Sequence, residues 1–342
     1  MRNLRTEEEM IANWKGDLDR PKVSICCITY NHESYIEDAL KGFLIQETDF
    51  PFEILIHDDA STDRTADIIR KYEAKYPRLI KSIYQAENQY SKGLKIAPTF
   101  LFPIAKGEYI ALCEGDDYWV SEKKLQIQTE LMQKYADINI SFHPAYKVDG
   151  FKLEKKKIYS NHGKALATFS LEDVILGGGG FMPTASLMIK STTLKTLPRW
   201  FFEYAPVGDY YIQAVSSLPG GALYIPKVMG GYRVGNPNSW SSTQGKLAAE
   251  KIQLDAENHK CCINEFINHN VDSEVLKKAI GFQLTFAALK AMKSNNQKLA
   301  RKLIKESLSV SKYRAFTQLI IYFFPALFKG TLFIKKCLTL KG

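Results

Sequence analysis

The chain has 342 residues, of which 45% are hydrophobic and 24% are charged, and its formal net charge is +9 at pH 7. This length and composition predict a globular protein with one large domain and a smaller addition, and they exclude a collagen-like or low-complexity chain. The charge is uneven, because residues 276–342 contain fourteen Lys or Arg and one acid and so carry +13, which leaves −4 on residues 1–275. A nucleic-acid-binding protein would be more uniformly basic, so we expect no nucleic-acid partner.

The six cysteines follow no disulfide or metal-binding pattern. None stands in a C-x-x-C spacing, and Cys26, Cys27 and Cys113 lie inside apolar runs, where cysteine packs as a small hydrophobic residue. Such usage is typical of a reducing compartment. We therefore expect a cytoplasmic protein.

In the first half of the chain, apolar runs rich in β-branched residues alternate with helical patterns. This alternation predicts strands joined by helices, and hence a mostly parallel sheet with helices on both faces. The polar turn at residues 58–63 precedes a helix that Ser61 or Thr62 would cap and that ends before Pro77. The predicted strands are residues 23–29, 53–57, 80–84 and 109–113, and the other predicted helices are residues 33–44 and 97–106.

The second half has a more mixed pattern and no internal repeat. The four glycines at residues 177–180 follow a predicted helix rather than a strand, so they predict a flexible loop and not a dinucleotide-binding turn. We predict helices at residues 170–176 and 208–217, strands at 185–189 and 223–228, a Gly/Asn/Ser-rich loop at 230–245, and a helical region from 246 to 310.

Three acids follow the predicted strand at residues 109–113. They are Glu114, Asp116 and Asp117, in the sequence Glu-Gly-Asp-Asp. Ligands of open α/β sheets bind at the carboxyl ends of the strands, and neighbouring carboxylates there repel one another unless a cation or hydrogen-bond donors neutralise them. Oxygen ligands of this kind suit Mg²⁺ or Mn²⁺ shared with a diphosphate. A solvated turn is the alternative interpretation.

Two other strand ends carry polar and aromatic residues. Tyr30 follows the first strand and offers a ring for stacking on a nucleobase, while the polar residues Thr29 and Asn31 beside it can reach the edge of the base. Asp59 follows the second strand, and its carboxylate can accept a hydrogen bond from an imide N–H of a base. A capped turn explains part of this second segment.

Residues 22–141 resemble the nucleotide-sugar-binding half of the family 2 glycosyltransferases, which have the GT-A fold. The segments that carry the resemblance are VSICCITYNHESYIEDAL, EILIHDDASTDRTADII and GEYIALCEGDDYW, and their order and spacing agree with the family. The resemblance implies an inverting, metal-dependent transfer of a sugar from a nucleotide sugar, with UDP as the nucleotide by family habit. The family commonly has Asp where this chain has Glu114, which leaves a metal role for Glu114 open.

The same resemblance implies a role for individual residues. It implies that Thr29, Tyr30 and Asp59 hold the base. It further implies that Asp116 lies near the ribose and the diphosphate, and that Asp117 is the ligand of Mg²⁺ or Mn²⁺.

A weaker resemblance extends to about residue 242. It implies that Asp209 is the catalytic base, and that Arg233 neutralises phosphate charge in a loop that closes over the donor. It also places Thr184 and Ser186 at the border of the acceptor site. The alternatives from the residues alone are a helix cap for Asp209 and a surface arginine for Arg233.

The C-terminal segment combines apolar and basic residues. Residues 316–334 are apolar and aromatic, but Pro325 and Lys329 interrupt them, so they do not predict a membrane span. With the flanking basic residues they suit an interfacial segment on the anionic inner face of the membrane, which would bring the enzyme to a lipid-linked acceptor; packing on the protein core is the alternative. The predicted regions are an N-terminal extension at 1–21, a glycosyltransferase domain at 22–245 (nucleotide-sugar binding at 22–141, acceptor side and lid at 142–245), a helical region at 246–311 and a basic apolar tail at 312–342.

The main functional hypothesis is a glycosyltransferase that acts on a saccharide or lipid-linked saccharide in surface polysaccharide biosynthesis. One alternative is a sugar-1-phosphate nucleotidyltransferase, but residues 29–33 do not match the glycine-rich basic loop that such enzymes share. The other is a catalytically inactive nucleotide-sugar-binding module, against which the intact acids argue.

Overall fold

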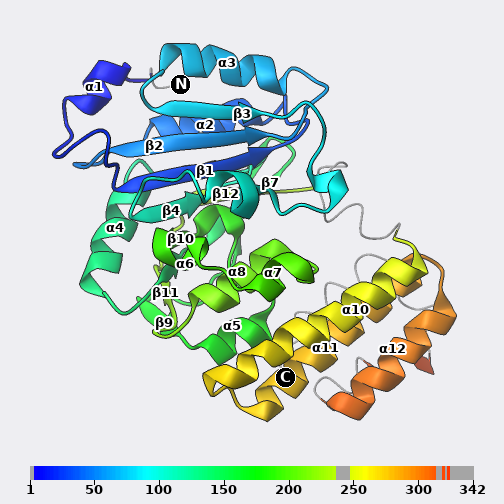
Figure 1. Ribbon diagram of the computed structural model, residues 1–342. Helices are drawn as coiled ribbons and strands as arrows, with labels where there is room; N and C mark the ends of the chain where they lie inside the picture. Colours follow the sequence, from blue (N-terminus) through cyan, green and yellow to red (C-terminus); the bar gives the residue numbers. More distant parts are fainter. Residues whose placement is uncertain (1–3, 236–246, 313–317, 320–321, 324–342) are drawn as a thin grey trace. The chain divides into compact units, whose positions relative to one another are not determined.

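The computed structural model describes residues 4–235, 247–312, 318–319 and 322–323 (Figure 1). These residues form two compact units, and all the predicted site residues belong to the first. The first unit comprises the described residues up to Val174 together with Gly179–Phe202 and Gly208–Val234, and the second comprises Ile175–Gly178, Glu203–Val207 and the described residues from Gly235 onward.

A mixed eight-stranded sheet forms the centre of the first unit, in the order β3-β2-β1-β4-β10-β6-β11-β9. Strands β1 to β4 run parallel, whereas β10 and β9 run antiparallel to their neighbours. This arrangement confirms the predicted α/β class. The strands are β1 (Val23–Thr29), β2 (Phe52–Asp58), β3 (Ile80–Tyr84), β4 (Tyr109–Leu112), β6 (Ile140–Phe142), β9 (Ala167–Phe169), β10 (Met188–Lys190) and β11 (Ala222–Tyr224).

The apolar runs of the first strands form the main hydrophobic core. Alternate residues of a strand point to the same face of the sheet, so Ile25 and Cys27 of β1 lie beside Ile54 and Ile56 of β2. All four are fully buried. Their cluster includes Leu40 and Phe43 of α2 (Ile36–Leu44) and Ile69 of α3 (Thr65–Lys75).

The other helices before β12 either precede β1 or lie between later strands. The predicted helix at residues 97–106 is too long. Only Ala97–Leu101 is helical, as a π-helix, because Pro103 lacks the N–H that would continue it. The predicted strand at 185–189 is shorter than expected, because a 3₁₀ turn at Thr184–Ser186 precedes β10. The helices are α1 (Glu7–Ile11), α4 (Lys124–Lys134), α5 (Leu171–Gly177), α6 (Ser191–Lys195), α7 (Arg199–Glu203) and α8 (Gly208–Ser216).

A second sheet of the first unit was not predicted. Its order is β5-β12-β7-β8, and its strands are β5 (Tyr118–Trp119), β7 (Ala145–Asp149), β8 (Lys152–Tyr159) and β12 (Gly230–Val234). The prediction of a loop from residue 230 is therefore wrong for β12. Its glycines permit a close approach, because a Cβ on Gly231 would lie 2.9 Å from Cζ of Tyr118. The rest of the predicted loop, at residues 236–245, lies outside the described residues.

The second unit is helical, which confirms the predicted helical region. It contains α10 (Ala249–Asn264), α11 (Ser273–Lys293) and α12 (Gln297–Val310). Helix α11 packs against both α10 and α12. Most of α11 is buried. No helix in the described part of the chain is both long and apolar enough to cross a membrane.

Little of the predicted basic apolar tail lies within the described residues. Gln318 is fully buried, and its Nε2 donates to Ser307 Oγ at 2.8 Å. At this residue the chain packs on α12. Leu319 and Phe323 are 44% and 63% exposed. The remainder of the tail lies outside the described residues.

A buried lysine stands at the start of α4. Lys124 is fully buried, its Nζ donates to Gln128 Oε1 at 2.6 Å, and the same Nζ lies 4.1 Å from the centre of the Trp119 ring. No acidic side chain in the described residues pairs with it. Burial consequently lowers the pKa of Lys124 to about 7.

This shift predicts a pH-dependent stability. An unfolded lysine titrates at about 10.4, so between pH 7 and that value the unfolded chain binds more protons than the folded one, and stability rises with pH. We expect the free energy of unfolding of the wild type, relative to Lys124→Met, to increase from pH 7 to pH 10 in urea titrations. Lys124→Met also removes the hydrogen bond to Gln128, but this loss does not depend on pH and so does not change the slope of stability against pH. Lys134→Met, at an exposed position of the same helix, should give no slope; a flat difference for Lys124→Met would contradict the prediction.

Candidate active site

The carboxyl ends of β1, β2 and β4 meet at one edge of the main sheet. The parallel register of these strands brings the loops that follow them side by side. The N–H of Asp59 donates to the carbonyl of Thr29 at 3.0 Å, and the N–H of Gly115 donates to that of Ile28 at 2.9 Å. The sheet therefore brings together the predicted site segments at residues 29–31, 58–63 and 114–117.

Side chains join the loops after β1 and β2. Asn31 Oδ1 accepts the N–H of Thr62 at 2.8 Å, and Ser61 Oγ accepts the N–H of Asn31 at 2.9 Å. His32 N–H donates to Thr65 Oγ1 at 2.8 Å. Asn31, predicted to bind the nucleotide, thus has its amide oxygen engaged within the protein, and sequence reasoning missed this contact because it joins residues 31 positions apart.

The start of α3 corrects the predicted cap. Ser61 Oγ donates to Asp58, and Thr62 contacts Asn31, so neither caps the helix. Instead Asp63 Oδ1 accepts the N–H of Thr65 at 2.9 Å, at the first residue of α3.

The Asp59 carboxylate lies between the β2 loop and the segment that follows β3. It is 4% exposed. Its Oδ1 accepts the N–H of Gln89 at 2.8 Å, and its Oδ2 accepts the N–H of Tyr90 at 3.0 Å. Sequence reasoning gave no role to residues 88–92, although the carboxylate fixes their backbone. Its predicted contact with a nucleobase stays a prediction.

Thr29 and Tyr30 differ in exposure. Thr29 is 3% exposed, and its Oγ1 lies 3.1 Å from Nδ1 of His32. Tyr30 is 43% exposed, as a ring that stacks on a ligand must be. Their predicted base contacts are not tested by these positions.

The acidic segment after β4 is electrostatically unfavourable by itself. Asp117 is 2% exposed; its Oδ1 accepts the N–H of Arg233 at 2.7 Å, and its buried Oδ2 has no hydrogen-bond partner in the described residues. Burial, followed by the charges of Asp116 and Glu114, raises the pKa of Asp117 well above its usual range. Burial, followed by the charges of Asp116 and Asp209, raises the pKa of Glu114 to about 8. An unpartnered carboxylate oxygen among like charges fits a divalent cation.

The glycine of this segment is required by close packing. A Cβ on Gly115 would lie 2.6 Å from Thr29 Oγ1 and 3.0 Å from His32 Nδ1. The acidic segment therefore lies directly on the loop after β1. No group of three or more His, Cys, Asp or Glu side chains in the described residues is arranged to hold a metal ion by itself.

Arg233 is held by the protein on every side of its guanidinium. It is 7% exposed, and its guanidinium carbon lies 4.8 Å from the ring centres of both Tyr35 and Tyr118. The guanidinium donates to Asp38, to the carbonyl of Asp116 and to the carbonyl of Gly150. These contacts favour a structural role, and the predicted role in phosphate binding stays a prediction.

Asp209 stands in the first turn of α8, near the acidic segment. Its Oδ1 accepts the N–H of Tyr210 at 2.7 Å. The residue as a whole is exposed, but the surrounding protein desolvates its carboxyl and thereby raises the pKa of Asp209. The pKa of the Tyr232 hydroxyl is also raised, by desolvation and by the charges of Asp117, Glu114, Asp209 and Asp116. Tyr232, at the start of the predicted closing loop, therefore lies near the acids of the site.

The two predicted acceptor residues lie in the 3₁₀ turn before β10. Ser186 is 1% exposed, and its hydroxyl donates to the carbonyl of Pro183 at 2.6 Å. The hydroxyl of Ser186 is thus engaged within the protein, and its predicted acceptor role stays a prediction. Thr184 is half-buried, so its acceptor role stays a prediction.

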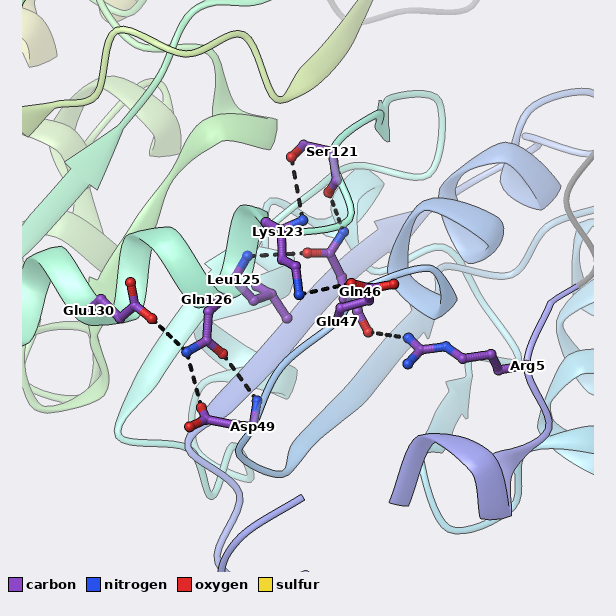
Figure 2. Close-up of polar contacts among 9 residues, drawn as sticks. All are labelled: Arg5, Gln46, Glu47, Asp49, Ser121, Lys123, Leu125, Gln126 and Glu130. Carbon is purple, nitrogen blue, oxygen red and sulfur yellow. Dashed lines mark hydrogen bonds and ion pairs between the residues drawn. The ribbon is translucent and has the colours of Figure 1, made fainter. Parts of the chain in front are cut away.

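Polar contacts fix the chain after the acidic segment to the end of α2 (Figure 2). Gln46 Nε2 donates to the carbonyl of Ser121 at 2.8 Å, and Gln46 Oε1 accepts the N–H of Leu125 at 3.1 Å. Lys123 pairs with Glu47 at 2.8 Å. The entry into α4 is thereby fixed. Arg5, Asp49, Gln126 and Glu130 extend this network.

Comparisons with known proteins agree with this geometry. The model of glycosyl transferase family 2 matches residues 24–193. An uncharacterized protein of Mycobacterium tuberculosis is 43% identical over 222 residues, which cover 64% of this chain and 61% of the relative. The chain thus spans about three-fifths of that relative. An uncharacterized glycosyltransferase of Nostoc sp. is 30% identical over 254 residues, which cover 72% of this chain and 76% of the relative. The Escherichia coli protein WfaP, named a UDP-Glc:α-D-GlcNAc-diphosphoundecaprenol β-1,3-glucosyltransferase, is 42% identical over 101 residues, 30% of this chain and 38% of WfaP.

Two solved structures share the fold at low sequence identity. Residues 1–349 of S. aureus TarS, in complex with UDP-GlcNAc, have a TM-score of 0.61 and 18% identity, over 88% of this chain and 89% of that one. The mannosyltransferase PcManGT of Pyrobaculum calidifontis, in complex with GDP-Man and Mn²⁺, has a TM-score of 0.54 and 14% identity, over 97% of this chain and 88% of that one. The chain belongs to glycosyltransferase family 2.

Proposed function

We propose that the chain transfers a sugar from a nucleotide-sugar donor to a saccharide hydroxyl, with inversion at the anomeric carbon. The observation that carries the proposal is the gathering of Glu114, Asp116, Asp117 and Asp209 around Tyr232, beside the loops at the carboxyl edge of the sheet. The acids at residues 114–117 suit a cation that binds the diphosphate of the donor, and the carboxylate of Asp209 suits a general base.

For the donor, we propose a uridine diphosphate sugar, which is supported by the UDP-GlcNAc bound to TarS. Exposed Tyr30 would stack on the base. The base would lie against Thr29, Asn31 and Asp59. The side chains of these residues make hydrogen bonds that hold the loops around the base site in place. Asp116 would face the ribose and the diphosphate.

For the cation, we propose Asp117 as the protein ligand, through its unpartnered Oδ2. A bound Mg²⁺ or Mn²⁺ would neutralise charge on the leaving diphosphate. Arg233 N–H would hold the other oxygen of Asp117 in a fixed orientation, because this bond is made by the rigid backbone of β12. Arg233 would therefore affect the diphosphate mainly indirectly, by orienting Asp117.

For the base, we propose Asp209. The acceptor oxygen would form a bond to the anomeric carbon as the bond from that carbon to the phosphate oxygen breaks. The acceptor proton would pass to the carboxylate of Asp209, and the nucleoside diphosphate would leave. A raised pKa makes Asp209 a stronger base than an ordinary aspartate.

Replacement of the base should separate donor binding from turnover. We expect Asp209→Asn to keep donor affinity and to lose turnover by on the order of 10² or more, as for removal of a general base. In the wild type, the acid limb of kcat/KM should lie above the ordinary Asp value of about 3.9, because desolvation raises the pKa of Asp209. Isothermal titration with donor and initial rates from pH 4 to pH 9 measure both. Asp137→Asn, at an exposed position outside the site, is the control; loss of donor binding in Asp209→Asn would remove Asp209 as the base.

Replacement of the metal ligand should act on the donor side. We expect Asp117→Asn to abolish the stabilisation that Mn²⁺ and UDP-sugar together give the wild type in thermal unfolding, because a neutral amide holds a divalent cation poorly. Transfer should fall with it. Full activity of Asp117→Asn, against the Asp137→Asn control, would show that the cation is bound elsewhere.

We also propose that the acceptor is a lipid-linked saccharide of surface polysaccharide biosynthesis and that the enzyme docks on the inner membrane face from the cytoplasm. WfaP, by its name, acts on a diphosphoundecaprenol acceptor. Helix α12 supports docking, because its buried residues lie on one face and its exposed basic residues lie on the other. The exposed basic residues are Lys298, Arg301, Lys302 and Lys305.

Docking should depend on these four charges. Each basic residue near an anionic surface contributes about 1 kcal/mol, so we expect their joint replacement by Gln to lower the partition onto phosphatidylglycerol vesicles by more than about tenfold at low salt. Neutral phosphatidylcholine vesicles should bind neither protein. The matched control replaces the exposed Lys71, Lys75, Lys134 and Lys155 by Gln. Equal co-sedimentation of the two variants would contradict docking through α12.

A further inference from the structure

The segment from Gly179 to Met182 lies beside the proposed base and is held in place. Gln213 is fully buried, and its Nε2 donates to the carbonyls of Gly179 at 3.2 Å and Met182 at 3.1 Å. Ser160 Oγ donates to the carbonyl of Gly180 at 3.2 Å. Gln213 follows Asp209 by one turn of α8, so the same helix carries the base and fixes the segment next to it.

Gly179 leaves space directly beside the carboxyl of Asp209. A Cβ on Gly179 would lie 3.5 Å from Oδ2 and 3.7 Å from Oδ1 of Asp209. Oδ1 already accepts the N–H of Tyr210, whereas no other residue in the described part of the chain donates a hydrogen bond to Oδ2. The oxygen that remains for an incoming hydroxyl is therefore the one nearer to Gly179.

The size of this space bears on the acceptor. A hydroxyl that gives its proton to a carboxylate lies about 2.6–3.2 Å from it, so the carbon that bears the hydroxyl also comes close to the carboxylate. In a secondary hydroxyl of a sugar ring, that carbon has two further carbon neighbours, and these need room on both sides. Water and a primary alcohol need less.

We infer that Gly179 is a specificity-determining residue, which keeps the approach to Asp209 Oδ2 wide enough for a secondary ring hydroxyl of a saccharide. The inference rests on the proposed function, because it takes Asp209 as the base. It adds the class of acceptor hydroxyl and a residue that selects it.

The test compares two neighbouring glycines. Neither Gly179 nor Gly180 has a left-handed backbone, and a Cβ on Gly180 would meet nothing within 4 Å. Ala and Val at each position therefore differ in what their side chains approach and not in backbone strain. The donor probe is UDP-GlcNAc; the acceptor probes are p-nitrophenyl 6-deoxyglucoside, which has only secondary hydroxyls, methanol, and water in the donor hydrolysis reaction.

We expect Gly179→Ala to lower kcat/KM for the 6-deoxyglucoside by more than about tenfold, and Gly179→Val to lower it further, because side-chain volume fills the approach to the base. Donor affinity, donor hydrolysis and transfer to methanol should change by less than about twofold, since these need less room. Gly180→Ala and Gly180→Val should resemble the wild type in every assay.

Three results would overturn the inference. The first is an equal loss of hydrolysis and saccharide transfer in Gly179→Ala, which would mean that the donor site has been disturbed. The second is an unchanged preference of Gly179→Ala between the 6-deoxyglucoside and methanol. The third is a wild type that does not favour the 6-deoxyglucoside over methanol. The Asp209→Asn variant distinguishes failure of the proposed function from failure of the inference. If Asp209→Asn loses turnover while Gly179→Ala is unaffected, Asp209 remains the base and only the role of Gly179 is wrong.

Discussion

The hydrogen bond from the backbone of Arg233 to Asp117 is the contact on which the geometry of the site depends. It joins β12, late in the first unit, to the acidic segment after β4, and the guanidinium of the same arginine adds contacts with Asp38 on α2 and with the carbonyl of Gly150. Tyr35 and Tyr118 enclose it. One residue thus fixes the acids relative to both sheets of the unit, and a shift of β12 would move the proposed metal ligand directly.

The acids held in this way repel one another, so electrostatic repulsion destabilises the site when no ligand is bound. Desolvation and like charges raise the pKa of Glu114 and Asp117, while a network of ordinary hydrogen bonds among residues 46–49 and 121–126 keeps the neighbouring backbone in place. The repulsion among these carboxylates is the term that a bound divalent cation would relieve. The fold supplies the rigidity, and the cation would supply the compensating charge.

The first strands and their loops could be predicted because their signals are local. An apolar β-branched run such as residues 23–29 identifies a buried strand without any knowledge of its neighbours, and β1 matches the predicted range. The second sheet could not be predicted, since β12 pairs with β5 and β7, more than 80 residues away in sequence, and its two glycines indicated a loop. The surroundings of Ser186 and Arg233 could not be predicted for the same reason. Both are buried by residues that are distant in sequence, which no local pattern reveals.

The second sheet also has consequences for association between copies of the chain. Its two edges are β5, which is only two residues long, and β8, where Lys152, Lys155 and Lys157 are exposed. A short edge strand offers few free backbone groups, and a lysine-rich one must desolvate and crowd its charges before another strand can pair with it. Both edges of this sheet therefore resist strand addition. A protein that gathers at high local density on a surface would otherwise be prone to edge-to-edge aggregation, and this sheet gives such aggregation no template.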